Sequence, residues 1–193
     1  MKEYVIATNN AHKVAEIEKE LAGKVKLVTL KELGFRGDIA ETSQTLQGNA
    51  EQKADFVYEK YHKNCFADDT GLEVEALGGR PGVYSARYAG EHCSFDDNID
   101  KLLEELGSTT HRRAKFRTVI CLIEEGKKYF FEGECKGTIA LERYGNGGFG
   151  YDPVFFPDRS GESFAEMSME TKNSISHRGK AIAKLATHIL KGC

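Results

Sequence analysis

Proline occurs only three times in this chain of 193 residues, and no segment is of low complexity. Both absences argue against long linkers and disordered tails. No stretch approaches the roughly 18 consecutive apolar residues of a membrane span. The opening residues MKEYVIATNN turn polar too early for a signal peptide. We therefore expect a globular protein without a membrane partner.

Cysteine pairs are also missing. The chain has no CxxC motif, and its cysteines are odd in number and widely spread, at Cys65, Cys93, Cys121, Cys135 and Cys193. This distribution disfavours a disulfide framework and a zinc site. It is typical of a protein of the reducing cytoplasm, which is the location we expect.

No excess of positive charge is present either, because the formal net charge is −3. A general nucleic-acid binder needs a basic surface, so we expect no nucleic-acid partner. A few lysines placed in one cleft can still bind a small anionic ligand. The hydrophobic content of 40% and the charged content of 30% are ordinary for a globular domain.

Hydrophobic periodicity and capping residues predict an alternation of strands and helices. Strands are expected at residues 2–8, 25–30, 114–124, 127–139 and 154–156, and helices at residues 11–22, 46–61, 95–106, 169–173 and 177–190. The two longest strands are joined by a short turn and form an antiparallel hairpin. The sequence therefore predicts an α/β fold with a mixed sheet.

The first strand leads through Thr8-Asn9-Asn10 into a helix, with Asn9 or Asn10 as its N-cap. The start of a helix presents backbone amides and partial positive charge to an anion. Lys13 lies in the first turn, where its charge opposes the helix dipole but suits a phosphate. The alternative is that Lys13 is an ordinary surface lysine.

Two adjacent carboxylates, Asp68 and Asp69, follow the apolar residues of a buried strand. Neighbouring residues of a strand point to opposite faces, so both aspartates can enter one pocket only if the chain turns. We expect that turn at Thr70-Gly71. Paired carboxylates with a third acid elsewhere suit Mg²⁺, which prefers oxygen ligands and is shared with substrate phosphates. The alternative is a capped turn without a metal.

A glycine cluster, GNGGFGYDP, spans residues 145–153. Its glycines let backbone amides approach a ligand closely, and Phe149 offers a stacking face for a base. His177 and Arg178, at the start of the last helix, can donate hydrogen bonds to a carbonyl-bearing purine edge. Composition alone thus reaches an α/β protein with a phosphate-binding or nucleotide-binding cleft.

Four segments together resemble the inosine triphosphate pyrophosphatase family, most closely its bacterial members. In chain order they are ATNNAHKVAEI, FADDTGLEVEALGGRPGVYSARYAG, GGFGYDPVFF and SHRGKA. The resemblance implies Mg²⁺-dependent hydrolysis of XTP, dITP and ITP to the monophosphate and pyrophosphate. It also implies a single domain over residues 1–193, with an elongated mixed sheet, flanking helices and two lobes around a central cleft, and a homodimer.

The resemblance assigns roles to individual residues. Asp69 is the expected base, supported by Asp68, and binds Mg²⁺ together with Glu41. The expected substrate contacts are Thr8, Asn9, Asn10, Ala11, His12, Lys13, Lys53, Thr70 and Lys172, with Phe149, Gly150, Tyr151 and Asp152 at the base and His177 and Arg178 at its 6-oxo group. Thr70 replaces the serine that relatives more often carry, and it keeps the hydroxyl.

Gly48 departs from the resemblance, because relatives often carry glutamate before the corresponding asparagine. A glycine inside a helix costs roughly 1 kcal/mol relative to alanine. The substitution raises the question of whether an acid beyond the metal ligands is missing.

Two other functions compete with this interpretation. One is a Maf-type pyrophosphatase for pyrimidine or modified nucleotides, against which the Ser-His-Arg segment favours purines. The other is a nucleotide-binding protein without turnover, against which the joint presence of Asp68, Asp69 and Lys13 argues.

Overall fold

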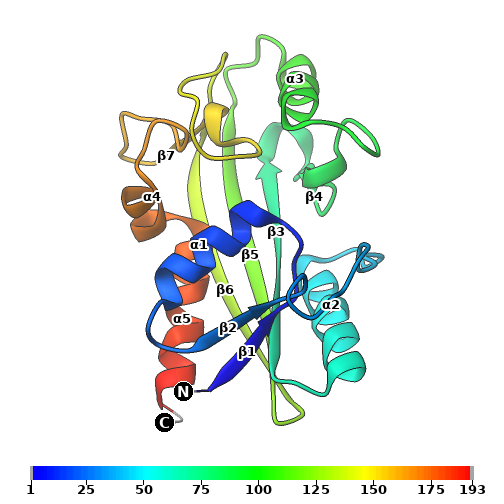
Figure 1. Ribbon diagram of the computed structural model, residues 1–193. Coiled ribbons are helices and arrows are strands. Elements are labelled where there is room, and N and C mark those ends of the chain that lie inside the picture. Colours follow the sequence, from blue (N-terminus) through cyan, green and yellow to red (C-terminus); the bar gives the residue numbers. More distant parts are fainter. Residues whose placement is uncertain (1, 192–193) are drawn as a thin grey trace. The chain divides into compact units, whose positions relative to one another are not determined.

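The structure, a computed structural model, describes residues 2–191. Strands and helices alternate along the chain (Figure 1). The strands are β1 (Glu3–Ile6), β2 (Lys26–Thr29), β3 (Cys65–Val74), β4 (Pro81–Gly82), β5 (Arg113–Glu124), β6 (Lys127–Ile139) and β7 (Phe155–Pro157). The helices are α1 (Ala11–Leu21), α2 (Leu46–Tyr61), α3 (Phe95–Leu106), α4 (Met169–Ile175) and α5 (His177–Lys191).

The strands form one mixed sheet in the order β2-β1-β3-β5-β6-β7, with β4 paired to β3. Strand β1 is parallel to β2 and β3, whereas β3–β4 and β6–β7 are antiparallel. The predicted α/β class with a mixed sheet is thereby confirmed. The predicted hairpin of β5 and β6 turns at Glu125 and Gly126, which both have positive φ, as a tight hairpin turn requires.

The chain divides into two compact units. The first holds the chain up to Asp69, Thr118–Gly133 and the chain from Arg178 onward. The second holds Thr70–Arg117 and Glu134–His177. Strands β3, β5 and β6 contribute residues to both units.

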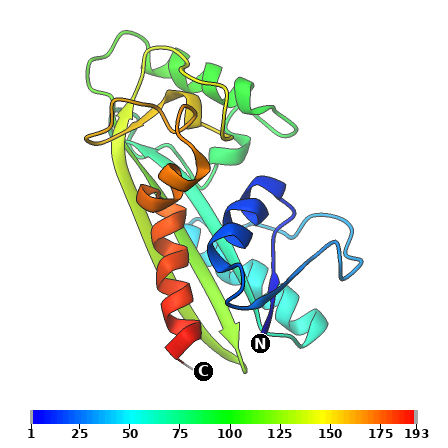
Figure 2. The same cartoon turned by 60° about the vertical axis from the view of Figure 1, so that its left-hand side comes forward.

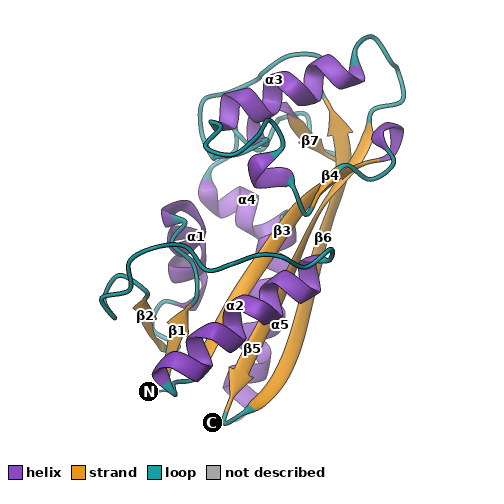
Figure 3. Cartoon of the chain, turned by 90° about the vertical axis from the view of Figure 1, so that its right-hand side faces the viewer, coloured by secondary structure: helices purple, strands orange, loops and turns teal. Residues whose placement is uncertain are grey.

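The first unit has helices on both faces of its strands. Tyr4 and Ile6 of β1 pack into one hydrophobic cluster with α1 and α5, and Figure 2 shows α5 lying along β6. Val5 and Ala7 pack into a second cluster with α2, which Figure 3 shows in front of the strands. This alternation is the period of two expected of a strand buried on both faces.

The second unit is built on a separate hydrophobic cluster that joins α3 to its parts of β3, β5 and β6. Buried Arg112 braces this unit, because its guanidinium donates hydrogen bonds to the backbone carbonyls of Gly107, Thr109, Ile139 and Ala140. Helix α3 begins with a capping box between Ser94 and Asp97, at the residue that the sequence predicts.

Four cysteines, Cys65, Cys93, Cys121 and Cys135, are free thiols, and Cys193 lies outside the described residues. Between residues 2 and 191, none of the helices is both long enough and apolar enough to cross a membrane.

Candidate functional site

Strand β3 runs unbroken through Asp68 and Asp69. The turn predicted at Thr70-Gly71 is therefore wrong. Leu72 and Val74 are buried, so the hydrophobic pattern of the strand continues past the glycine and keeps the chain extended. Because neighbouring side chains of a strand point to opposite faces, the two aspartates lie on opposite faces of the strand and contact different side chains.

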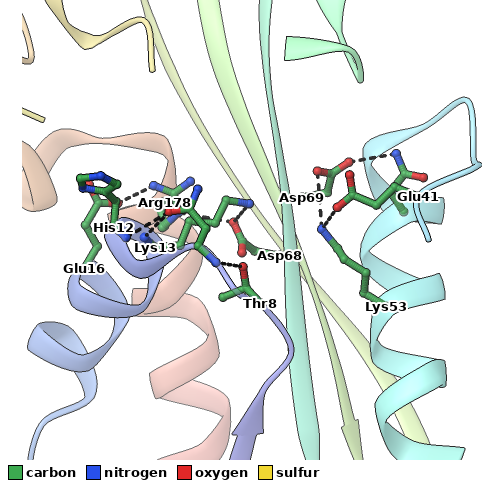
Figure 4. A network of polar contacts seen from close by, with 11 residues as sticks. Thr8, His12, Lys13, Glu16, Glu41, Lys53, Asp68, Asp69 and Arg178 are labelled. Carbon is green, nitrogen blue, oxygen red and sulfur yellow. Dashed lines mark hydrogen bonds and ion pairs between the residues drawn. The ribbon is translucent and has the colours of Figure 1, made fainter. Parts of the chain in front are cut away.

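Asp68 lies on the face covered by α1 and α5 and belongs to a buried network of charges (Figure 4). Lys13 Nζ lies 3.0 Å from Asp68 Oδ2, and Arg178 Nε lies 3.4 Å from the same oxygen. Arg178 also donates to Glu16 of α1 through Nη1. Sequence reasoning missed Glu16, although it lies one helical turn after Lys13.

Asp69 lies on the opposite face, against α2 (Figure 4). Asn49 Nδ2 donates to Asp69 Oδ2 at 3.1 Å, and Lys53 Nζ lies 3.8 Å from Asp69 Oδ1. The ammonium of Lys53 also donates to Glu41. The structure thus brings three predicted site residues together, with one lysine contacting both carboxylates. Asn49 is a further member that the sequence did not indicate.

The pKa values of the two aspartates move in opposite directions. Burial favours the neutral acid at Asp68, but Lys13, Arg178 and Lys53 outweigh it and lower the pKa of this carboxyl. Burial raises the pKa of Asp69, and Glu41 adds to this, while Lys53 and Lys13 only partly oppose it. Two acids whose pKa values shift in opposite directions are typical of a site in which one acid accepts a proton while the other stays charged.

Glu41 and Asp69 are suitable ligands for a hard cation, although no cluster of three or more His, Cys, Asp or Glu side chains in residues 2–191 could hold a metal ion. Mg²⁺ is commonly bound by one or two carboxylates together with substrate phosphates and water. The two carboxylates also attract a cation already, because the Lys53 ammonium contacts both. The donor chemistry therefore fits a magnesium ion that the protein shares with its substrate.

Of the two residues predicted as the N-cap of α1, Asn9 and Asn10, the structure has Asn10 in this position. Its Oδ1 accepts from the backbone amides of His12, at 3.0 Å, and Lys13, at 3.2 Å. These two amides are therefore satisfied within the protein, contrary to the expectation that the helix start leaves its amides open. Thr8 Oγ1 accepts from the amide of Asn10, and Asn9 Nδ2 donates to the carbonyl of Gly37. Ala11 is the exposed first residue of the helix.

The structure gives a steric reason for the glycine at position 48 of this chain. Gly48 lies in the first turn of α2, where its amide donates to the N-cap Thr45. A Cβ atom at Gly48 would lie 2.0 Å from Oγ of Ser43, so a side chain there would displace the serine. The loop that carries Glu41 thus packs closely against the helix at Gly48.

In the second unit, Asp152 connects two other predicted site residues. Its Oδ2 accepts from the Phe149 amide at 2.9 Å and from Lys172 Nζ at 2.7 Å. The same ammonium lies 4.8 Å from the centre of the Phe149 ring, within the range of a cation–π contact. Gly148 has φ +69° and leaves room for this carboxylate, because a Cβ atom would lie 2.1 Å from Oδ2. Lys172 therefore contacts the loop that is predicted to bind the base, and its predicted contact with phosphate stays a prediction.

The remaining predicted residues differ in their surroundings. Tyr151 is buried and donates its hydroxyl to the carbonyl of Ser85 at 2.7 Å. His177 is buried and stacks on Phe116, with ring centres 4.6 Å apart. Thr70 and Gly150 are half-buried. Both rings thus have partners within the second unit, and their contacts with a base stay predictions.

Comparison with known proteins agrees with these features. The model of the Ham1 family matches residues 4–188. A protein of Porphyromonas gingivalis named dITP/XTP pyrophosphatase is 59% identical over 191 residues, which are 98% of each chain. A protein of the same name from Flavobacterium johnsoniae is 51% identical over 181 residues, which are 94% of each chain.

Solved structures agree as well. The Staphylococcus aureus Ham1 protein has a TM-score of 0.90 at 41% identity, with 100% of both chains covered. A HAM1 protein from Coxiella burnetii has a TM-score of 0.91 at 36% identity, covering 99% of this chain and 100% of its own. The resemblance identified from the four segments is confirmed, and the chain belongs to the Ham1 family.

Proposed function

We propose that this protein is a nucleoside-triphosphate pyrophosphatase that hydrolyses XTP, dITP and ITP to the monophosphate and pyrophosphate. The observation that carries the proposal is the similarity, over nearly the whole chain, to proteins named dITP/XTP pyrophosphatase. Removing non-standard purine nucleotides from the nucleotide pool is the corresponding role. We further propose that the enzyme acts as a homodimer in the cytoplasm.

The proposed reaction is attack of a water molecule on the α-phosphorus. The water oxygen forms a bond to phosphorus, the bond between phosphorus and the bridging oxygen breaks, and pyrophosphate leaves. Asp69 accepts the proton of the water, and its carboxylate is held for this role by contacts with Lys53 and Asn49. Asp68 stays ionised and holds Lys13, which with Lys53 offsets the charge of the phosphates.

Magnesium is the proposed cofactor, held by Glu41 and Asp69. Bound there, it would neutralise phosphate charge and lower the pKa of a coordinated water. The ammonium of Lys53 contacts both of these carboxylates. Loss of Mg²⁺ is expected to leave a folded protein without turnover.

Hydrogen-bond donors at the purine 6-position are the proposed source of selectivity. His177 and Arg178 are the candidates, and a 6-oxo group accepts their hydrogen bonds, whereas the amino group of adenine does not. A donor left unpaired in a buried site costs roughly 1–3 kcal/mol, which supports discrimination of about tenfold to a hundredfold per contact.

Pyrophosphate release from a panel of nucleotides tests the proposal. With Mg²⁺, we expect dITP, XTP and ITP to be hydrolysed with kcat/KM values about 10 to 100 times that of ATP, as one such contact allows. Without Mg²⁺, release should stop. Faster hydrolysis of dTTP or UTP would indicate the pyrimidine-specific alternative. Binding of dITP without release of pyrophosphate would mean that the protein is not this enzyme.

Phe149 can be tested by itself as the base platform. Stacking of a base on an aromatic ring is worth about 1–3 kcal/mol, so Phe149→Ala should raise KM for dITP by about 5- to 150-fold. The chain contains no tryptophan, so Phe149→Trp provides a single tryptophan as a fluorescent probe at this position. The emission of this tryptophan should change when dIMP binds, and the KM of Phe149→Trp for dITP should stay close to that of the wild type. An unchanged KM in Phe149→Ala would show that the base binds elsewhere.

A further inference from the structure

Three neighbouring residues of the loop before α2 each contact a different side chain of that helix. Glu41 accepts from Lys53 Nζ. The Thr42 amide donates to Gln52 Oε1 at 2.9 Å, and the Ser43 amide donates to Asn49 Oδ1 at 2.9 Å. Helix positions three and four residues apart share one face, so Asn49, Gln52 and Lys53 present a continuous edge to the loop. The position of Glu41 therefore depends on α2.

Asn49 differs from Gln52 because it also contacts strand β3. Its side chain is fully buried, and its two polar ends have different partners: Oδ1 accepts from Ser43, and Nδ2 donates to Asp69 at 3.1 Å. A backbone donor at one end and a carboxylate at the other fix the orientation of the amide. One side chain thus links the loop of Glu41 to the carboxylate of Asp69.

We propose that Asn49 is a positioning residue that sets Glu41 and Asp69 at the separation a shared divalent cation requires. The inference rests on the proposed function, since it takes these two carboxylates as the metal ligands. Its own content is that the pair is assembled through one amide on α2. A group beyond the ligands that orients them typically changes metal affinity or activity by about 10- to 100-fold when it is removed.

Direct measurement of Mn²⁺ binding by electron paramagnetic resonance tests the proposal without turnover. We expect Asn49→Ala to raise the Kd of Mn²⁺ by about 10- to 100-fold, as for other residues that orient metal ligands. The matched control is Gln52→Ala, which removes a contact with the same loop but none with Asp69, and its Kd should stay within about threefold of the wild type. In parallel, Asn49→Ala should lower kcat for dITP more than it raises KM.

Coupling to Glu41 separates positioning from a general loss of stability. If Asn49 acts through the ligand pair, its effect on the Kd of Mn²⁺ should largely disappear in a Glu41→Gln background, so the two substitutions are not additive. Additive effects, a folded Asn49→Ala with unchanged Mn²⁺ binding, or an equal loss in Gln52→Ala would each overturn the inference. A wild-type protein that binds no Mn²⁺ would instead overturn the metal role in the proposed function.

Asn49 is fully buried, so a measurement on the wild-type protein is needed in case the variant does not fold. In a ¹⁵N-labelled sample, titration with Mg²⁺ should shift the side-chain amide of Asn49 and the backbone amide of Ser43 with one common Kd. If the backbone amides of α2 and the loop shift while the Asn49 side chain does not, the inference is wrong.

Discussion

Asp69→Asn is expected to lower kcat for dITP by about 100- to 10,000-fold, the usual contribution of a general base. The amide has nearly the same shape as the carboxylate but cannot accept the proton of the attacking water. Burial already disfavours the charged form of Asp69, so removing its charge should not destabilise the fold. Steady-state kinetics with dITP and thermal unfolding of the same sample measure both effects.

Lys53→Met in the wild-type background is the control for this variant. Lys53 contacts both Asp69 and Glu41, and it keeps Glu41 as a partner when Asp69 is neutral. Because Lys53 is a proposed phosphate contact, its replacement should affect phosphate binding and hence KM. Turnover of Asp69→Asn within tenfold of the wild type would exclude Asp69 as the base. An unfolded variant would contradict the expectation that its charge is dispensable for stability.

Asp68→Asn, unlike Asp69→Asn, is expected to destabilise the protein, by about 3–5 kcal/mol, the range for breaking a buried ion pair. Lys13 and Arg178 would lose the carboxylate that compensates their charges, although Glu16 still contacts Arg178. Unfolding in urea at neutral pH measures the change. A loss below about 1 kcal/mol, the value of an exposed pair, would mean that the network does not behave as buried.

The stability difference between the wild type and Asp68→Asn should depend on pH, as the direction of the pKa shift of Asp68 determines. The pKa of Asp68 is lower in the folded protein, so its contribution is fully present above the ordinary aspartate pKa of about 4. It is lost as the pH falls toward the folded-state pKa. The stability gap between wild type and Asp68→Asn should therefore be largest at neutral pH and narrow in acid.

Much of the secondary structure could be predicted because its signals are local. Helix α2 begins after Thr45 and helix α3 after Ser94, and each of these residues accepts a hydrogen bond from a backbone amide of the first turn. The hairpin between β5 and β6 follows from two long β-rich runs and a turn at Glu125 and Gly126. These elements need no knowledge of distant contacts.

The site was harder to predict because it depends on which face each residue occupies. Asp-Asp-Thr-Gly is a pattern typical of turns, and only the burial of Leu72 and Val74 beyond it keeps the strand straight. Glu16 and Asn49 are polar residues on helices, which without tertiary contacts are indistinguishable from solvated ones. Both are buried in the structure, where Glu16 contacts Arg178, itself a partner of Asp68, and Asn49 contacts Asp69.

The unbroken course of β3 makes the spacing of its residues a chemical constraint. One step along the strand separates the carboxylate that holds Lys13 from the carboxylate beside Lys53. A shift of pairing by a single residue exchanges the two faces of a strand. Insertion or deletion of one residue between Cys65 and Asp68 would therefore turn Asp69 toward the face of Lys13 and Arg178, and Asp68 toward the face of Lys53 and Glu41. In this segment of the chain, length decides the partners of each aspartate as strictly as the identity of the residue does.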